Sequence, residues 1–349
     1  MAAANCHNDI KSYHDKQVTL GTAEQSDMRA RRDAGRTRLN NGLSGAGHTK
    51  PSHFHVQGSY AMRTMVHDPQ NDYDIDDGTY FEKDDLRDQN GTYLTPKESR
   101  QRVATALKDG RLLYDAKVLN NCVRQAYPEG YHIDIPVYRI LRSKDVWGKD
   151  NEDYELASGD EWVKSDARDV TGWYKDKVKT ELNQGQDDTS QLRRLTKLTK
   201  KQARSRIAWK SQTTSGISVT KLVVDNQRLA TDRDDLALRR TWQAIKAQLD
   251  FSQRIAHPIA NNRNLASDGD EGVKFFRDRL AEALKTLEVL DDPDCTLKQA
   301  RAAWNTVFNT TYFSDLPDNG GNDGSKGSGP FIVSSGTKTK RDDNNGRFG

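Results

Sequence analysis

An unusual crowding of carboxylates limits what this chain can fold into: Asp72, Asp74, Asp76 and Asp77 all lie in the segment NDYDIDDG. In a β-strand, side chains two residues apart share a face, so Asp72, Asp74 and Asp76 would point the same way. Like charges on one face raise each other's pKa unless a cation neutralises them. Mg²⁺ prefers such hard oxygen ligands. The segment is therefore expected to be a strand that binds a divalent ion.

The same cluster has two other interpretations. An acidic run is most often a solvated loop, and this interpretation stays open at this point. The spacing also resembles the start of an EF-hand calcium loop. Counted from Asp72, the sixth position needs glycine but holds Asp77, and the twelfth needs glutamate but holds Lys83, so the calcium loop is excluded.

A further carboxylate lies on a second predicted strand. The segment YHIDIPVYRI, residues 131–140, alternates strongly and places Asp134 between two isoleucines. A buried carboxylate is costly unless it is paired or binds a metal. If the two strands are neighbours, Asp74, Asp76 and Asp134 could together hold two metal ions, an arrangement that serves phosphoryl or nucleotidyl transfer.

The pair Gly58-Ser59 precedes the acidic segment and fits the same chemistry. Glycine lets the backbone approach a phosphate closely, and N–H groups at the start of a following helix can bind one. The Ser59 hydroxyl adds a donor, and Thr64 could reinforce the loop. A Gly-Ser pair alone is more often an ordinary turn.

The remaining patterns predict an α+β fold with a mixed α/β N-terminal half and a mostly helical C-terminal half. We expect a domain at 1–150, a helical lobe at 151–314 and a flexible tail at 315–349, which is rich in Gly, Asp, Asn, Ser and Lys. Strands are expected within 53–83 and at 131–140. Helices are expected within 8–45 and at 97–127, 155–182, 190–209, from Ser218, and at 234–250, 271–290 and 296–309. Trp162, Trp173, Trp242 and Trp304 are expected in the core.

Composition narrows the class of protein. The formal net charge is only +3, so no overall field attracts nucleic acid. No apolar run approaches the roughly 18 residues that span a bilayer, and no secretory signal is evident, so no membrane partner is expected. The cysteines form no C-x-x-C pair. These features favour a cytoplasmic protein without a zinc ribbon or a disulfide framework.

The combination QGSYAMRTM, DYDIDDGTYF and YHIDIPVYRI resembles the polymerase-β-type nucleotidyltransferases. Within that superfamily it is most similar to the bacterial cGAS/DncV-like enzymes (CD-NTases) of the cyclic GMP–AMP synthase type. The resemblance implies a nucleotidyltransferase core, a helical C-terminal lobe and a long N-terminal helix that braces both.

The resemblance also implies an activity, namely Mg²⁺-dependent joining of ATP and GTP, or other NTPs, into a cyclic dinucleotide of the 3′,3′-cGAMP kind with release of pyrophosphate. Mn²⁺ is able to substitute in this chemistry. These enzymes act in CBASS anti-phage defence, where the product activates an effector.

The resemblance also assigns residues. Asp74 and Asp76 would bind both Mg²⁺ ions, and Asp134 would bind one and help to activate the attacking 3′-hydroxyl. Gly58 and Ser59 would hold the donor triphosphate, with Gln57 close by.

Two further residues would bind nucleotide. One lysine of RRLTKLTKKQARSR would contact phosphate, and we choose Lys200 over Lys201, although a charged helix is usually a solvated face. Ser215 would lie near the donor nucleotide, and its structural alternative is a helix N-cap. Tyr80 could stack on a base, although an aromatic residue on a strand is more often part of the core.

The end of the chain offers a possible partner site. Many relatives are encoded beside ubiquitin-transfer-like proteins that conjugate the synthase's last residue to targets, so Gly349 is a possible conjugation site. The alternative is an ordinary frayed terminus.

Two alternative functions remain at this stage. The chain could be a linear nucleotidyltransferase that acts on RNA or a small acceptor. It could also be a non-enzymatic nucleic-acid-binding protein that uses the basic helix at 190–210.

Overall fold

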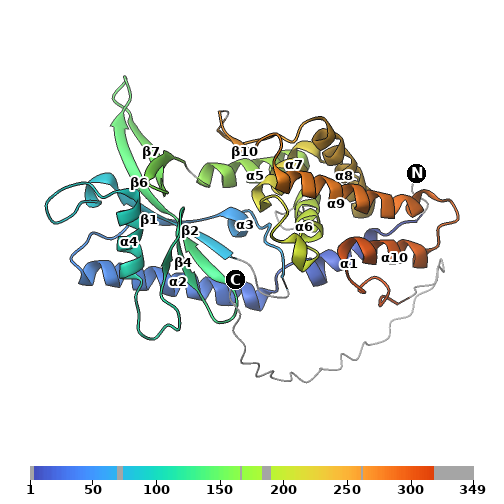
Figure 1. Cartoon of the computed structure of the whole chain (residues 1–349), viewed down its shortest axis with the longest axis horizontal. Helices are drawn as coiled ribbons and strands as arrows, with labels where there is room; N and C mark the ends of the chain where they lie inside the picture. The colour runs from blue at the N-terminus through green and yellow to red at the C-terminus, as the bar shows by residue number, and fades with distance from the viewer. Residues whose placement is uncertain (1–3, 69–73, 166, 183–189, 261, 318–349) are drawn as a thin grey trace. The chain divides into compact units, whose positions relative to one another are not determined.

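The computed structural model describes residues 4–68, 74–165, 167–182, 190–260 and 262–317 (Figure 1). The chain divides into two units, Met1–Asp315 and Leu316–Gly349. The predicted tail and Gly349 lie almost wholly outside the described residues, as does Asp72. None of the described helices has both the length and the apolar character needed to cross a bilayer.

The N-terminal region is helical but interrupted. It consists of α1 (His7–Tyr13), a π-helical turn (His14–Val18) and α2 (Thr22–Gly45). The break follows from extended backbone at Thr19 and Gly21, and the Glu24 side chain accepts a hydrogen bond from the Gly21 N–H at the start of α2. The buried residues of α2 are Met28, Leu39 and Leu43, and α2 packs against α4 and β2 (Figure 1).

A mixed sheet forms the core of the first half, with eight strands among the described residues. Their order is β3-β4-β5-β2-β6-β7-β8, and β1 pairs with β2. The strand β2 runs parallel to both β5 and β6, and the other pairs are antiparallel. Their bounds are β1 His53–Gln57, β2 Asp74–Glu82, β3 Lys117–Val118, β4 Val123–Ala126, β5 His132–Ile135, β6 Val137–Lys144, β7 Asp150–Ser158 and β8 Glu161–Lys164.

The predicted helix at 97–127 is wrong in its second half. Helix α4 spans Pro96–Ala106, with proline at its first position and a capping box between Thr95 and Glu98. Beyond it, residues 107–116 form a turn-rich connection and β3 and β4 follow. Val118 and Val123 pair across these two strands, so β-branched residues on a pleated surface prevail over helical periodicity.

The predicted helix at 155–182 begins too early. Residues up to Ser158 continue β7, Gly159 makes the turn with φ +54°, and β8 returns along β7. Helix α5 begins at Ala167. Trp162 lies on β8 and Trp173 on α5, and both are half-buried, whereas Trp242 and Trp304 are fully buried, as expected.

The second half is mostly helical. Its elements are α5 Ala167–Leu182, α6 Gln191–Ala203, α7 Gly216–Asn226, α8 Asp234–Phe251, α9 Glu271–Thr286 and α10 Leu297–Phe308, with a small hairpin of β9 Ile255–Ala256 and β10 Asn264–Ala266. Short helical turns are α3 Gly58–Ala61, Lys83–Asp85, Ile207–Trp209 and Leu287–Asp291.

Helix α6 is a buried helix and not the solvated basic face that its charges suggest. Leu192, Leu195 and Leu198 are completely buried. The hydroxyls of Thr196 and Thr199 donate to backbone carbonyls one turn earlier, which satisfies them inside the helix. The basic side chains of α6 are consequently held in the interior or at its edge.

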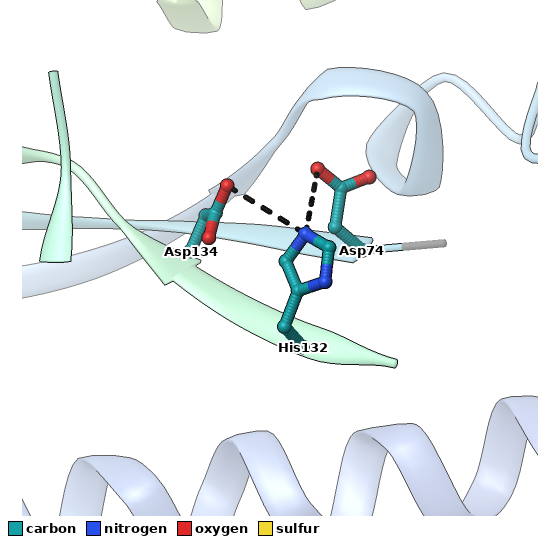
Figure 2. A group of neighbouring side chains, drawn as sticks. All are labelled: Asp74, His132 and Asp134. Carbon is teal, nitrogen blue, oxygen red and sulfur yellow. Dashed lines mark ion pairs between the residues drawn. The ribbon is translucent and has the colours of Figure 1, made fainter. Parts of the chain in front are cut away.

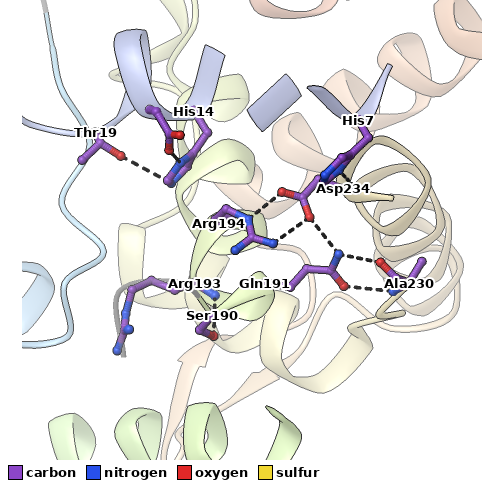
Figure 3. Close-up of polar contacts among 10 residues, drawn as sticks. His7, His14, Thr19, Ser190, Gln191, Arg193, Arg194, Ala230 and Asp234 are labelled. Atoms are coloured by element: carbon purple, nitrogen blue, oxygen red, sulfur yellow. Dashed lines mark hydrogen bonds and ion pairs between the residues drawn. The ribbon is translucent and has the colours of Figure 1, made fainter. Parts of the chain in front are cut away.

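A buried polar network joins α6 to α8 and α1 (Figure 3). Asp234 is fully buried and accepts hydrogen bonds from Arg194, at 2.9 Å from Nη2, and from Gln191 at 2.8 Å. Its backbone N–H donates to Nδ1 of His7 at 3.0 Å. The network pairs the charge of Arg194 with that of Asp234, so the buried carboxylate of Asp234 is not an isolated charge.

Candidate active site

The carboxylates predicted to act together do converge in the fold. In the parallel pair of β2 and β5, Asp74 lies opposite His132 and Asp76 lies opposite Asp134. Ile75 and Ile133 point to the opposite face and are buried in the core. The three aspartates line one cavity of about 740 Å³. The condition that the two strands be neighbours is thus met.

Asp77 belongs to the other face of β2. It is buried, and the guanidinium of Arg36 on α2 donates to its carboxylate at 2.7 Å. The crowded acidic segment therefore splits into two groups, one in the cavity and one that ties the N-terminal helix to the sheet.

The cavity carboxylates repel one another strongly. Burial, together with the charges of Asp74 and Asp134, raises the pKa of Asp76 well above its ordinary value. Asp134 is held by Arg124 of β4, which donates from Nε and Nη2 to its two oxygens at 2.7 Å each. Arg124 and Lys200 act on Asp76 with two positive charges against three carboxylates, so the cavity favours a further cation.

Gly58 occupies the position that demands glycine most clearly. Its φ is +66°, and an added Cβ would lie 2.9 Å from Cγ of Asp76 and closer still to Oδ2. Side chains other than glycine rarely adopt this backbone conformation. The backbone at Gly58 thus passes directly beside a cavity carboxylate, and Ser59 lines the same cavity.

Lys200 reaches the cavity from α6. Its Nζ donates to Oγ1 of Thr64 at 3.1 Å, and the Thr64 N–H donates to the carbonyl of Ser59 at 2.8 Å. Burial lowers the pKa of Lys200 to about 8, although the charge of Asp74 acts in the opposite direction. Lys201 instead donates to the carbonyl of His67 at 2.9 Å. Of the two lysines considered, the geometry puts Lys200 beside the acids.

Two other predicted residues also line the cavity. Ser215 is the N-cap of α7, and its Oγ accepts from the Ser218 N–H at 3.2 Å. Its capping role and its position in the cavity are compatible. Gln57 is buried and its Nε2 donates to Oη of Tyr138 at 3.2 Å. Both residues line the cavity that contains the three aspartates.

Tyr80 is a core residue and has no room to stack on a base. It is fully buried, and its ring stacks on His53 and on Tyr138, with both pairs of ring centroids 4.5 Å apart. The structural interpretation of this residue is the correct one.

Comparison with known proteins shows which family the domain around the aspartates resembles. Residues 52–138 match the family described as cyclic GMP-AMP synthase DncV-like, nucleotidyltransferase domain. The chain contains a DncV-like nucleotidyltransferase domain. The expected resemblance and the enzyme class are thereby confirmed.

Solved structures extend the similarity of the fold beyond that domain. The apo form of Vibrio cholerae DncV is 17% identical, with a TM-score of 0.65, and the match covers 87% of this chain and 95% of that one. The Bradyrhizobium diazoefficiens CD-NTase CdnG in complex with GTP is 14% identical, with a TM-score of 0.66 and coverage of 89% and 97%. Escherichia coli MS115-1 CdnC, in complex with HORMA, is 15% identical, with a TM-score of 0.64 and coverage of 88% and 98%. The predicted α+β nucleotidyltransferase fold with its helical C-terminal region is confirmed.

The DncV-like nucleotidyltransferase domain contains most of the predicted site. Gln57, Gly58, Ser59 and the three cavity aspartates all fall within residues 52–138. Lys200 and Ser215 lie outside this segment, in the region that is similar in fold only.

Sequence reasoning missed two residues of the DncV-like domain that contact or face the aspartates. They are Arg124 and His132. Alternation offered a weak signal for His132, because it lies two residues before Asp134 on the same strand face. Nothing in the local pattern of β4 distinguishes Arg124, because its role depends on pairing with β5.

The donor set fits a divalent cation. One atom each from Asp74, His132 and Asp134 lies within 4.8 Å of the others (Figure 2). Asp76, with its raised pKa, borders the same space. Oxygen-rich sites of this kind suit Mg²⁺ or Mn²⁺.

Proposed function

We propose that this protein joins nucleoside triphosphates into a cyclic oligonucleotide, with a 3′,3′-cGAMP-like cyclic dinucleotide as the product, and releases pyrophosphate. The observation that carries the proposal is the convergence of Asp74, Asp76 and Asp134 with Gly58 and Lys200 around one cavity. Its volume of about 740 Å³ lies in the upper part of the ~300–1,000 Å³ range of small-molecule sites.

Each group in the cavity has a role in nucleotidyl transfer. The three aspartates would hold divalent ions, which in this chemistry stabilise the attacking and leaving oxygens. Asp134, held by Arg124, would orient the 3′-hydroxyl that attacks the α-phosphate. Lys200 would supply positive charge to the triphosphate as a mobile point charge. Gly58 allows the triphosphate to approach the backbone closely.

The relatives support a cyclic product made from purine nucleotides. A structure of Vibrio cholerae DncV, a cyclic AMP-GMP synthase, contains the linear intermediate 5′ pppA(3′,5′)pG. The CdnG structure contains GTP. We therefore propose ATP and GTP as the substrates of this chain, with Mg²⁺ or Mn²⁺ as the cofactor.

A nucleic-acid-binding function is a weaker explanation. The basic helix that would carry it is α6, whose Arg193 and Lys200 are buried. Binding through phosphates requires exposed cations. This function also gives no role to the three cavity aspartates.

The test is a template-free assay with purified protein, labelled NTPs and Mg²⁺ or Mn²⁺. The products are treated with phosphatase and the surviving species are identified by mass spectrometry. A phosphatase-resistant product that is absent from an Asp74→Asn/Asp76→Asn variant is expected. If only phosphatase-sensitive products formed, or if transfer required an added RNA acceptor, the protein would be a linear nucleotidyltransferase.

We further propose that the protein acts in the cytoplasm, in CBASS defence. Its proposed domains are a core at 1–150, a helical lobe at 151–314 and a tail at 315–349. Its product would activate an effector. Gly349 would be conjugated to targets by ubiquitin-transfer-like proteins. Co-expression with such proteins should yield conjugates of the full chain and none of a chain lacking Gly349. Conjugates that persist without Gly349 would remove this part of the proposal.

A further inference from the structure

The side chain of His132 lies close to Asp74 and Asp134, two of the carboxylates that line the cavity. It is on β5, opposite Asp74 and two residues before Asp134. Its side chain is 13% exposed, and Nε2 lies 3.8 Å from Oδ2 of Asp74 and 3.9 Å from Oδ2 of Asp134. Figure 2 shows this nitrogen directed between the two carboxylates.

These distances do not describe a hydrogen-bonded histidine. A separation beyond about 3.6 Å is too long for a hydrogen bond. Among the residues that the structure describes, the ring of His132 makes no other polar contact than these two. Nε2 of His132 is therefore close to both carboxylates without being held by a hydrogen bond to either of them.

The same distances do suit ligands around a common ion. Nε2 of His132 and Oδ2 of Asp74 are 3.8 Å apart. This separation is slightly less than twice a metal–ligand bond length of ~2.0–2.1 Å, so one ion between the two atoms can bind both. Asp134 remains able to bind an ion while Arg124 holds it, because a carboxylate has about four lone-pair sites and Arg124 uses two.

An imidazole ligand changes which ion the site prefers. Mg²⁺ binds almost only to oxygen, whereas first-row transition ions also accept imidazole nitrogen. Mn²⁺ combines tolerance of nitrogen with the preference for carboxylates that the aspartates satisfy. A site with two carboxylates and one imidazole therefore gains affinity for Mn²⁺ that it does not gain for Mg²⁺.

We propose that His132 binds the catalytic divalent ion through Nε2 and makes the site select Mn²⁺ over Mg²⁺. The inference rests on the proposed function in one respect, namely that the aspartates hold a divalent ion beside the triphosphate. It adds a ligand and an ion preference to that function.

The test measures Mn²⁺ bound to the full chain in the presence of α,β-methylene-ATP, a probe that cannot undergo transfer. Electron spin-echo envelope modulation detects ¹⁴N coupling from a coordinated imidazole, and the free Mn²⁺ signal gives the affinity. The variants are His132→Gln, whose amide offers an oxygen in place of the nitrogen, and His48→Gln as the matched control. His48 follows α2 and, unlike His132, belongs to no group of described residues that could hold a metal ion.

The wild type and His48→Gln are expected to show ¹⁴N coupling, and His132→Gln is expected to lack it. His132→Gln should bind Mn²⁺ about tenfold or more weakly and bind Mg²⁺ almost as well as the wild type, on the scale of ligand-shell effects. Wild-type protein that binds no Mn²⁺, or binds it without ¹⁴N coupling, would overturn the inference. So would coupling that persists in His132→Gln.

The result is separable from the proposed function. Nucleotidyl transfer without ¹⁴N coupling would leave the function intact and remove the role of His132. Coupling without any transfer would leave the ligand assignment intact and remove the function.

Discussion

Replacing Gly58 with alanine should disable the site while leaving the fold largely intact. The added Cβ would lie 2.9 Å from Cγ of Asp76, against the 3.4 Å at which ordinary contact begins. Because real Cβ contacts essentially never fall below 3.0 Å, the carboxyl group of Asp76 must shift, and Oδ2, the atom nearest to the added Cβ, must move furthest. Catalytic groups must be held within about 0.5 Å, and a misplacement of about 1 Å can cost 10²-fold in rate. We expect kcat to fall about 10²-fold.

The same substitution carries a separate cost in stability. Alanine at φ +66° is in the left-handed region, which costs about 1–2 kcal/mol. Gly47 supplies the matched control, because its φ is +72° and an added Cβ would meet nothing within 4 Å. Gly47→Ala should lose similar stability in urea unfolding and retain its activity.

The assay is initial-rate nucleotide transfer at saturating NTP, combined with urea unfolding of both variants. Equal activity of Gly58→Ala and wild type would refute the reasoning, because Asp76 could then move without consequence. Equal loss of activity in both variants would also refute it, because backbone strain alone would then explain the effect.

Three further predictions concern stability and charge. Lys200→Met should lower activity about 10²-fold or more. It should nevertheless raise the free energy of unfolding at pH 7 by about 2 kcal/mol, because burial disfavours the charged ammonium and lowers the pKa of Lys200 to about 8. Lys201→Met should retain activity in the same assays. Burial lowers the pKa of His14 to about 4, below its value in the unfolded chain, so the unfolded chain binds more protons than the folded one. The free energy of unfolding should therefore fall by about 2 kcal/mol from pH 7 to pH 5. Urea unfolding of His14→Gln at the two pH values should lack this decrease. Asp234→Asn should cost about 3 kcal/mol, because it removes the buried carboxylate charge that pairs with Arg194. Asp250→Asn, in an exposed pair, should cost less than about 1 kcal/mol. Similar melting temperatures for the two variants would contradict the account.

The predicted strands around the site followed from period-two alternation. Hydrophobic residues such as Ile75 and Ile133 alternate with the acids, which is why both strands and the shared face of Asp74 and Asp76 could be inferred. Alternation does not reveal which strands are neighbours. The convergence on Asp134 was therefore conditional until the parallel pairing of β2 and β5 was known.

Local pattern does not show features that depend on tertiary structure. Charged residues concealed the burial of α6, although Leu192, Leu195 and Leu198 recur every three residues and mark an apolar stripe. Arg124 acquires its role only through strand pairing, and no local pattern contains that information.

The central claim is that the carboxylates in the cavity, and not the acidity of the segment in general, carry out nucleotidyl transfer. Single-turnover transfer of labelled ATP and GTP should be measured for Asp74→Asn, Asp76→Asn and Asp134→Asn. Asp84→Asn is the control, because Asp84 is an exposed acid just beyond β2. The account predicts losses of about 10³-fold in each of the first three variants, equivalent to several kcal/mol of lost charge stabilisation, and a rate near that of the wild type in the control. A folded variant of Asp74, Asp76 or Asp134 that transfers nucleotide at the wild-type rate would contradict it.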